Sequence, residues 1–180
     1  MTASLEPLQA LVLGRSQMSE LTKNLAQNLV AIISDFGLID NYAGVMKGVM
    51  LDIASPLEIV DITHQVPPQN VLVARFALAT AVAYFPAGTV FLSVVDPGVG
   101  TGRRAIAART KSHYFVGPDN GIFSAVFERD PAIAAVELNN SNYWRDAQPS
   151  STFHGRDIFA PAAAHLANGV ALKQLGEAIA

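Results

Sequence analysis

The sequence predicts an α/β fold with a mostly parallel central sheet and helices on both faces. Expected strands and helices alternate along the chain, which is the order that right-handed crossover connections give in a parallel sheet. The expected strands are continuously apolar rather than alternating with polar residues, as a sheet covered on both faces requires. The 180 residues are most simply one domain.

The first half of the predicted domain contains two strand–helix units and a third strand. Ser55-Pro56 ends the first helix, and Pro86-Ala87-Gly88 ends the second, because proline and glycine interrupt helical patterns. The predicted elements are, in order, a buried strand at 29–33, a helix at 42–53, a strand at 57–62, a mostly apolar helix at 70–85 and a strand at 89–95.

The second half follows a glycine-rich turn. Its predicted elements are a hairpin of strands at 105–109 and 113–117, a short helix at 121–127, a short strand at 134–138 and a closing helix at 158–168. We expect these elements to belong to one domain over residues 29–180. Residues 1–28 stand apart, and we expect a mobile extension there, with 19–25 able to form a loose amphipathic helix.

Composition excludes several classes of function. Twelve basic and fifteen acidic side chains give a net charge of −3, which does not favour binding to nucleic acid. The absence of cysteine excludes disulfides, thiolate zinc sites and a cysteine nucleophile. The longest apolar stretch, 71–85, carries Arg75 and is shorter than the roughly 20 residues that span a bilayer. Glu6 and the lack of a basic start argue against a signal peptide. We expect a cytoplasmic protein without a membrane partner.

Acidic residues occur near the ends of the first three predicted strands. Asp35 follows the first strand, Asp61 lies at the end of the second, and Asp96 follows the third. A single aspartate in such a place is usually a turn or cap residue. Because ligands bind beyond the carboxyl ends of parallel strands, three together favour a binding site at this edge.

The glycine-rich turn after the third strand does not match a nucleotide-binding fingerprint. Gly98, Gly100 and Gly102 are followed by Arg103, whereas the dinucleotide motif needs a different spacing and a following helix. We interpret the turn as backbone that approaches a ligand closely while Asp96 and Arg103 face one another. The alternative is a tight loop with a surface ion pair of little energetic weight.

The segment 150–157 is a second concentration of polar residues. Asp157 could cap the closing helix, whereas His154 is less easily explained in that way. A lone loop histidine is usually structural or exposed. We interpret His165 as structural, whereas His113 starts a strand and gives no functional signal. The sequence contains no H-E-x-x-H or comparable spacing, so we expect no catalytic metal. Residues 118–121 favour a turn, with the wall of a site as the alternative.

Five motifs occur in one order: Ser34-Asp35-Phe36-Gly37, Asp61-Ile62-Thr63-His64, Val95-Asp96-Pro97-Gly98-Val99-Gly100-Thr101, Pro118-Asp119-Asn120-Gly121 and Ser151-Thr152-Phe153-His154-Gly155-Arg156-Asp157. Together they resemble the S-adenosyl-L-methionine (SAM) hydroxide adenosyltransferases, or SAM hydrolases, which are relatives of fluorinase and chlorinase. The resemblance covers about residues 30–179 and implies the Rossmann-like N-terminal domain of that family.

The resemblance also implies the roles of individual residues. Asp96, Arg103 and His154 correspond to a triad that orients or activates water. Either His154, oriented by Asp96, accepts the proton while Arg103 holds hydroxide, or the Arg103–Asp96 pair does most of this work. Asp35 corresponds to the aspartate that holds the ribose hydroxyls. We expect three further residues to bind substrate: Thr152, Phe153 and Asn120.

The implied reaction is hydrolysis of SAM to adenosine and L-methionine, with no cofactor. Halogenating relatives carry an aromatic residue at the position of Asp96 and a serine at that of Gly155, so water is the expected nucleophile. Family members form trimers and continue into a smaller C-terminal β-domain that completes the neighbour's site. We expect this chain to carry the N-terminal domain alone. The alternative is a catalytically inactive domain that binds nucleosides or serves assembly.

Overall fold

The computed structural model describes residues 28–179. The predicted extension at 1–28 therefore lies, apart from Asn28, outside the described residues. Within residues 28–179, no helix has the length and apolar character needed to cross a membrane.

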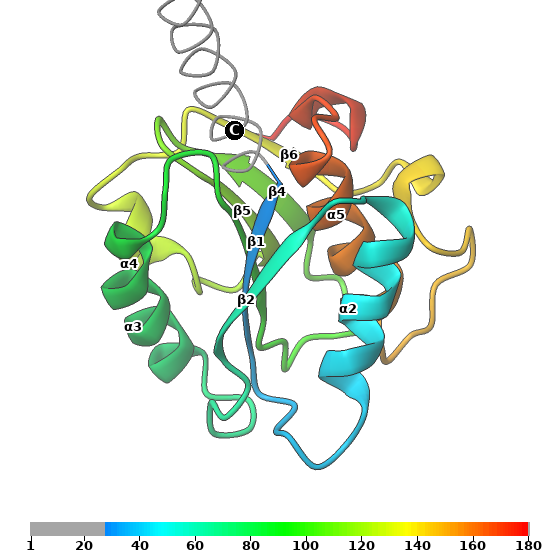
Figure 1. Cartoon of the computed structure of the whole chain (residues 1–180), viewed down its shortest axis with the longest axis horizontal. Helices are drawn as coiled ribbons and strands as arrows, with labels where there is room; N and C mark the ends of the chain where they lie inside the picture. Colours follow the sequence, from blue (N-terminus) through cyan, green and yellow to red (C-terminus); the bar gives the residue numbers. More distant parts are fainter. Residues whose placement is uncertain (1–27, 180) are drawn as a thin grey trace, which may run out of the picture.

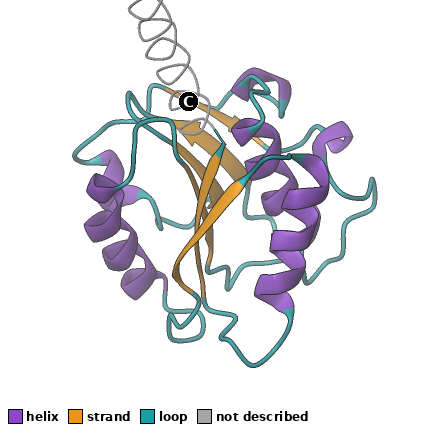
Figure 2. Cartoon of the chain, viewed as in Figure 1, coloured by secondary structure: helices purple, strands orange, loops and turns teal. Residues whose placement is uncertain are grey.

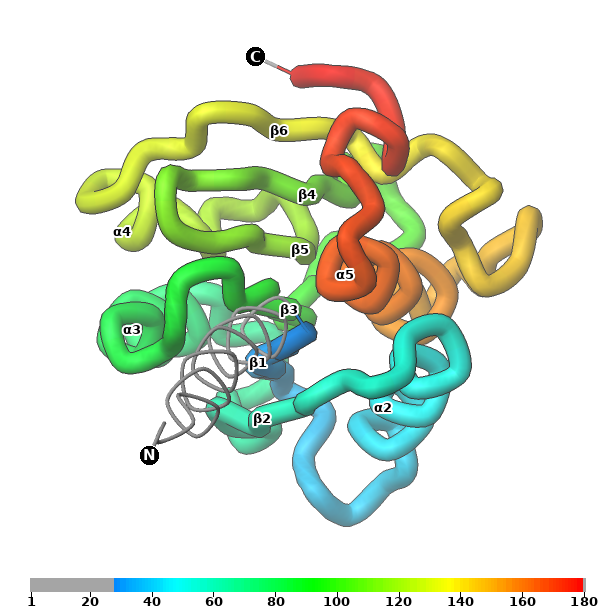
Figure 3. Tube along the Cα trace, turned by 45° about the horizontal axis from the view of Figure 1, so that its top comes forward, coloured from blue at the N-terminus to red at the C-terminus, as the bar shows by residue number. Residues whose placement is uncertain are grey.

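A six-stranded mixed sheet forms the centre of the molecule (Figures 1 and 3). Its strands run in the order β2-β1-β3-β5-β4-β6, and β2, β1, β3 and β5 are parallel. β4 is antiparallel to both β5 and β6, which confirms the predicted hairpin. The bounds are β1 (Leu29–Ser34), β2 (Glu58–Thr63), β3 (Val90–Val94), β4 (Ala105–Arg109), β5 (Tyr114–Pro118) and β6 (Ala134–Glu137).

Helices cover both faces of this sheet (Figures 1 and 2). α2 (Tyr42–Ile53) and α5 (Ala160–Ala167) lie on one face, and α3 (Val71–Ala81) and α4 (Ser124–Phe127) lie on the other. A π-helical turn, Gly155–Phe159, leads into α5. Short 3₁₀ turns occupy Val82–Tyr84, Ser141–Tyr143 and Leu172–Gln174.

Two apolar clusters hold the layers together. On one face, Met46 and Met50 of α2 belong to the same buried cluster as Leu92 of β3. On the other, Phe91 and Phe115 stack with ring centroids 5.3 Å apart. These side chains are fully buried, and each such burial contributes about 1.5–3 kcal/mol. Successive residues of the central strands point to opposite faces, and both faces are buried. This explains why apolar and polar residues do not alternate in their sequences.

The helix ends differ from the sequence predictions in three places. The helix predicted at 70–85 ends at Ala81 and tightens into the 3₁₀ turn, since Pro86 disfavours helical geometry at Phe85. The helix predicted at 121–127 is helical only from Ser124, after Gly121 adopts a φ of +87°. The closing helix, predicted from residue 158, follows a helical path from Gly155 onward.

The topology brings two motif-bearing loops together at one edge of the sheet. β1 and β3 are adjacent and in register, with Ser34 opposite Val94. Their next residues, Asp35 and Val95, therefore leave the sheet side by side. β2 lies on one side of β1 and β3 on the other, so successive crossover connections leave β1 in opposite directions. Such a switch point opens a crevice beyond the carboxyl ends of the parallel strands.

Candidate active site

A cavity of about 260 Å³ opens at this switch point. Residues from three of the five sequence motifs line it, together with two residues from the loop before α3. Its lining is Asp35, Phe36, Pro68, Gln69, Val94, Asp96, Val99, Thr152, Phe153, His154 and Gly155. Five of the seven residues predicted to bind substrate or act in catalysis therefore line one cavity: Asp35, Asp96, Thr152, Phe153 and His154.

Asp96, Arg103 and His154 form one hydrogen-bonded row beside the cavity. Arg103 Nε donates to Asp96 Oδ1 at 2.9 Å and to Oδ2 at 3.0 Å, and Arg103 Nη2 also contacts Oδ2. The same Nη2 lies 2.8 Å from His154 Nδ1. The side chains of Arg103 and Asp96 are only 10% and 6% exposed, so the alternative of a surface ion pair is wrong.

The row fixes the state of the His154 ring. An arginine can only donate, so Nδ1 of His154 accepts the bond from Arg103. Burial and the neighbouring Arg103 charge lower the pKa of His154, with Asp96 and Asp157 acting in the opposite direction. The ring is therefore neutral at pH 7 and carries its proton on Nε2.

Asp96 does not orient His154 directly, contrary to the expectation from sequence. Arg103 lies between them, because its planar fork binds the carboxylate with one edge and the imidazole with Nη2. Asp96 thus orients Arg103, and Arg103 orients His154.

The glycine-rich turn brings the 96–103 loop into contact with the 150–157 loop. Gly100 has a φ of +76°, and a Cβ atom at this position would lie 2.4 Å from the carbonyl oxygen of Ser151. A Cβ on Gly98 would lie 3.1 Å from Cγ of Arg103. The turn therefore packs its backbone against the 150–157 loop, and Val99 of the same turn lines the cavity. A close approach of this backbone to a ligand stays a prediction.

The π-helical turn presents His154 to the cavity. His154 is the residue just before it, and Asp157 lies inside it with 1% exposure. Asp157 Oδ2 accepts a 2.9 Å hydrogen bond from the backbone N–H of Ser150, and Arg156 donates to both carboxylate oxygens. Asp157 therefore closes the loop, and the predicted capping role is wrong because its side chain faces back toward Ser150.

Asp35 also lines the cavity and is held by a backbone hydrogen bond. Its Oδ2 accepts a 2.7 Å hydrogen bond from the backbone N–H of Gln69. Gln69 has a φ of +64°, a left-handed conformation that is uncommon for a residue other than glycine. Such conformations cluster at ligand sites. Sequence reasoning missed Gln69, and the only available signal was its place after Pro67-Pro68, where a chain must turn before a helix.

Three aromatic rings form the apolar part of the site. Phe36, Tyr42 and Phe153 have centroids 5.0–5.7 Å apart, with Phe153 edge-on to both others. Phe36 and Phe153 line the cavity. Only Phe153 was among the predicted binding residues, because the other two rings belong to a loop and a helix start whose approach depends on tertiary structure.

Three predicted site residues lie outside the cavity lining, and one of them, Arg103, is bonded to Asp96 and His154, which line it. The Asn120 amide donates to the Val95 carbonyl at 2.9 Å, and its oxygen accepts from Ile122 N, which is the turn interpretation of residues 118–121. Asp61 lies within β2 and bonds to Lys47 and His64. A substrate contact by Asn120 stays a prediction.

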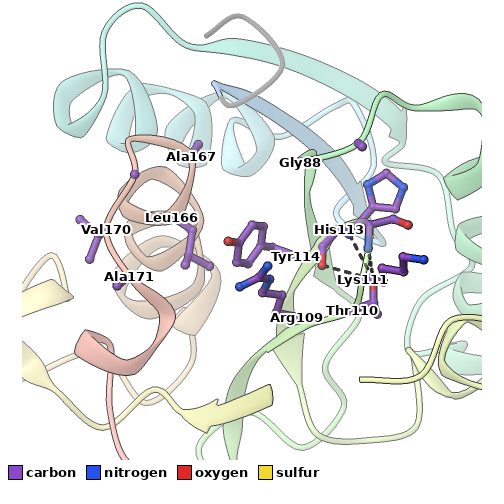
Figure 4. A pocket seen from close by; sticks show the side chains of 13 residues that line it. Gly88, Arg109, Thr110, Lys111, His113, Tyr114, Leu166, Ala167, Val170 and Ala171 are labelled. Carbon is purple, nitrogen blue, oxygen red and sulfur yellow. Dashed lines mark hydrogen bonds between the residues drawn. The ribbon is translucent and has the colours of Figure 1, made fainter. Parts of the chain in front are cut away.

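A larger cavity of about 640 Å³ lies at the opposite edge of the sheet (Figure 4). Arg109, Tyr114, Leu166 and Val170 surround it. None of the motif residues lines it, so we assign the site to the smaller cavity. In residues 28–179, no group of three or more His, Asp or Glu side chains is arranged to hold a metal ion.

Comparison with known proteins places this geometry in a family. The model of the SAM hydroxide adenosyltransferase N-terminal domain matches residues 30–176. A (R)-S-adenosyl-L-methionine hydrolase of Thermus thermophilus is 46% identical over 155 residues, covering 82% of this chain and 60% of the relative. One from Salinispora tropica is also 46% identical, over 83% of this chain and 57% of the relative.

More distant and structural relatives agree. A fluorinase of Actinoplanes is 30% identical over 84% of this chain and 58% of the relative. The crystal structure of an uncharacterized conserved protein from Thermotoga maritima superimposes with a TM-score of 0.82 at 46% identity, covering 84% of this chain and 58% of that one. The chain thus spans about three fifths of the length of these relatives. It belongs to the SAM hydroxide adenosyltransferase family.

Proposed function

We propose that this member of the SAM hydroxide adenosyltransferase family hydrolyses SAM to adenosine and L-methionine in the cavity between β1 and β3. One observation carries the proposal: Asp96 and His154, which Arg103 joins by hydrogen bonds, line the same cavity as Asp35. The names of the Thermus and Salinispora relatives support the same reaction.

The proposed step is a displacement at the ribose C5′ carbon. The water oxygen forms a bond to C5′ while the C5′–S bond breaks, and the bonding pair stays on sulfur as a neutral thioether. Since methionine leaves neutral at sulfur, the step needs no general acid. One proton must leave the attacking water, so the protein's task is to align that water and accept its proton.

The residues of the row divide this task. Asp96 lines the cavity, and its Oδ1 accepts only one of the bonds from Arg103, so a lone pair is free to accept the water proton. His154 offers an N–H at Nε2, because its Nδ1 is bound to Arg103. We therefore assign proton acceptance to Asp96 and alignment to His154, while the Arg103 charge holds an oxygen that becomes hydroxide-like.

Asp35 is suited to hold the ribose. Gln69 occupies one lone pair of Oδ2, which leaves Oδ1 for the vicinal hydroxyls. Phe153 and Phe36 supply an apolar wall, and Thr152 lies beside them in the lining. We propose that C5′ of the bound substrate lies within reach of both Asp35 and the row, since Asp35, Asp96 and His154 line one cavity.

The packing around Gly155 supports water rather than halide as the nucleophile. A Cβ at Gly155 would lie 3.1–3.3 Å from Met46 Sδ, Phe153 Cε2 and Val94 Cγ1. A serine side chain there, as in the halogenating relatives, would displace these groups. The glycine therefore fits a cavity without a halide-binding hydroxyl.

We also propose a Rossmann-like fold for this domain. The strand order 2-1-3, with α2 and α3 on opposite faces, supports the doubly wound, Rossmann-like description. The homotrimer implied by the family resemblance stays a prediction. Since the chain spans about three fifths of its relatives, nucleoside binding without turnover is the second candidate function.

Isotope labelling tests the chemistry directly. SAM is incubated with the 180-residue chain in H₂¹⁸O, and the products are analysed by mass spectrometry. We expect one ¹⁸O in the 5′-hydroxyl of adenosine and none in methionine. Labelled homoserine together with 5′-methylthioadenosine would contradict attack at C5′, because the oxygen would then have joined the methionine side chain. Adenosine binding without product would favour the second candidate function.

A further inference from the structure

We propose that His64 is a positioning residue that holds Asp35 in its ribose-binding geometry through Ser34. The proposal rests on the proposed function for one point only, namely that Asp35 binds ribose. It goes beyond the Asp96–Arg103–His154 row, because His64 lies behind the cavity and does not line it.

The basis is a chain of side-chain hydrogen bonds under the Asp35 loop. Ser34 Oγ lies 2.7 Å from His64 Nδ1, and His64 Nε2 lies 3.0 Å from Asp61 Oδ1. Lys47 Nζ donates to Asp61 Oδ2 at 2.6 Å. Ser34 is fully buried and His64 is 3% exposed, so water cannot replace these bonds freely.

The donors and acceptors of this chain fit one arrangement. Asp61 bonds to both Lys47 and His64, and although partial burial raises its pKa, these partners bring it below the usual range. An ionised Asp61 accepts from Nε2–H of His64, which leaves Nδ1 as the acceptor for the Ser34 hydroxyl proton. Ser34 Oγ is then free to accept from Phe36 N at 3.4 Å. The network thus spans Asp35 in sequence, from Ser34 to Phe36.

The same loop reaches Asp35 a second time. The backbone N–H of Gly37 donates to the His64 carbonyl at 2.7 Å, and Gln69, five residues further along, donates to the Asp35 carboxylate. His64 therefore anchors the start of a loop whose other end holds the carboxylate itself. A register shift between Ile32 and Ile33 in the β1–β2 pairing adds one β2 residue just before this anchor. Bulges of this kind redirect side chains beside functional sites.

His113 is a natural control for burial without this connection. It is 7% exposed, but its Nδ1 has no hydrogen-bond partner among the described residues. His113 directly precedes β5 and therefore lies at the amino ends of the parallel strands, whereas Asp35 follows the carboxyl end of β1. A change at this residue tests what loss of any buried imidazole does to the fold.

The test measures ribose selectivity rather than affinity alone. Calorimetry gives the Kd of adenosine and of 2′,3′-dideoxyadenosine, which lacks the hydroxyls that Asp35 would hold. A charge-assisted hydrogen bond corresponds to about a 10- to 100-fold preference for adenosine in the unmodified chain. Asp35→Ala is expected to bring this preference close to one.

Two substitutions of His64 separate its two bonds. His64→Asn places an amide near Nδ1 and keeps the Ser34 bond, so most of the preference should stay. His64→Gln reaches toward Asp61 and leaves Ser34 without its partner, so the preference should fall about tenfold while the dideoxyadenosine Kd is unchanged. Ser34→Ala should behave like His64→Gln, and His113→Asn should keep the full preference.

The outcomes distinguish the two proposals. A preference that survives in His64→Gln and Ser34→Ala, or an equal loss of affinity for both nucleosides, overturns the positioning role. If the unmodified chain shows no preference, the ribose role of Asp35 fails instead. In that case, hydrogen exchange of the Gln69 amide in the ligand-free chain tests whether His64 positions Asp35. Exchange should be faster in His64→Gln but not in His64→Asn. Equal exchange in both variants overturns the proposal.

Discussion

Replacing Arg103 by methionine should destabilise the whole domain as well as the site. The Asp96 side chain is 6% exposed, and its described side-chain partner is Arg103. Removing one member of a buried pair leaves an uncompensated charge, which typically costs about 3–5 kcal/mol. Methionine keeps part of the apolar contact with Phe159, whose ring centroid lies 5.2 Å from the Arg103 Cζ. The lost charge should therefore dominate the effect.

The matched variants are Asp96→Asn and the double variant Asp96→Asn/Arg103→Met. The double variant removes both charges together, and replacing a buried pair by neutral groups is often nearly neutral. We expect its free energy of unfolding to return to within about 2 kcal/mol of the unmodified chain. Its turnover of SAM should stay absent, because the residues that align water are gone.

Urea denaturation followed by circular dichroism measures these free energies. The expected coupling energy between positions 96 and 103 is large, and it appears as strong non-additivity in the double-mutant cycle. A cost below about 1 kcal/mol for Arg103→Met would refute the reasoning, because that is the range of an exposed ion pair.

Three further predictions follow from the site. Burial and Arg103 hold the pKa of His154 below its ordinary value of 6.5. As the pH is lowered, the rate of SAM hydrolysis should therefore begin to fall only below pH 6.5. A loss of rate that begins above pH 6.5 would contradict this assignment. Gly100→Ala should cost about 2–4 kcal/mol in urea unfolding, from left-handed strain and the Ser151 contact, and a neutral effect would mean that the two loops are not in contact. Asp35→Ala should raise the KM for SAM about tenfold in steady-state assays, and unchanged KM and kcat would remove its ribose role.

Much of the fold was predictable because it depends on local apolar runs. The strands around Ile32 and Leu92 are buried on both sides, and their sequences show it. The helix ends were less accessible, since the turn at Gly155 is stabilised by Asp157 reaching back to Ser150. That contact depends on how the loop folds, which a cap pattern does not describe.

The site shows the same division. Asp96 and Arg103 are seven residues apart and were expected to face each other, as they do. The order of the row was not predictable, because it depends on Arg103 reaching His154 across 51 positions. The position of Gln69 after two prolines indicates a turn but not a partner, so the bond from its backbone N–H to Asp35 emerges only from the structure.

The most direct test of SAM hydrolysis is a chromatographic assay of the 180-residue chain with SAM. It scores the release of adenosine and methionine by the unmodified chain, by His154→Ala and by the matched control His113→Asn. The account predicts equimolar release that is lost in His154→Ala and kept in His113→Asn. Equal release by all three proteins, or none by a folded unmodified chain, would contradict it.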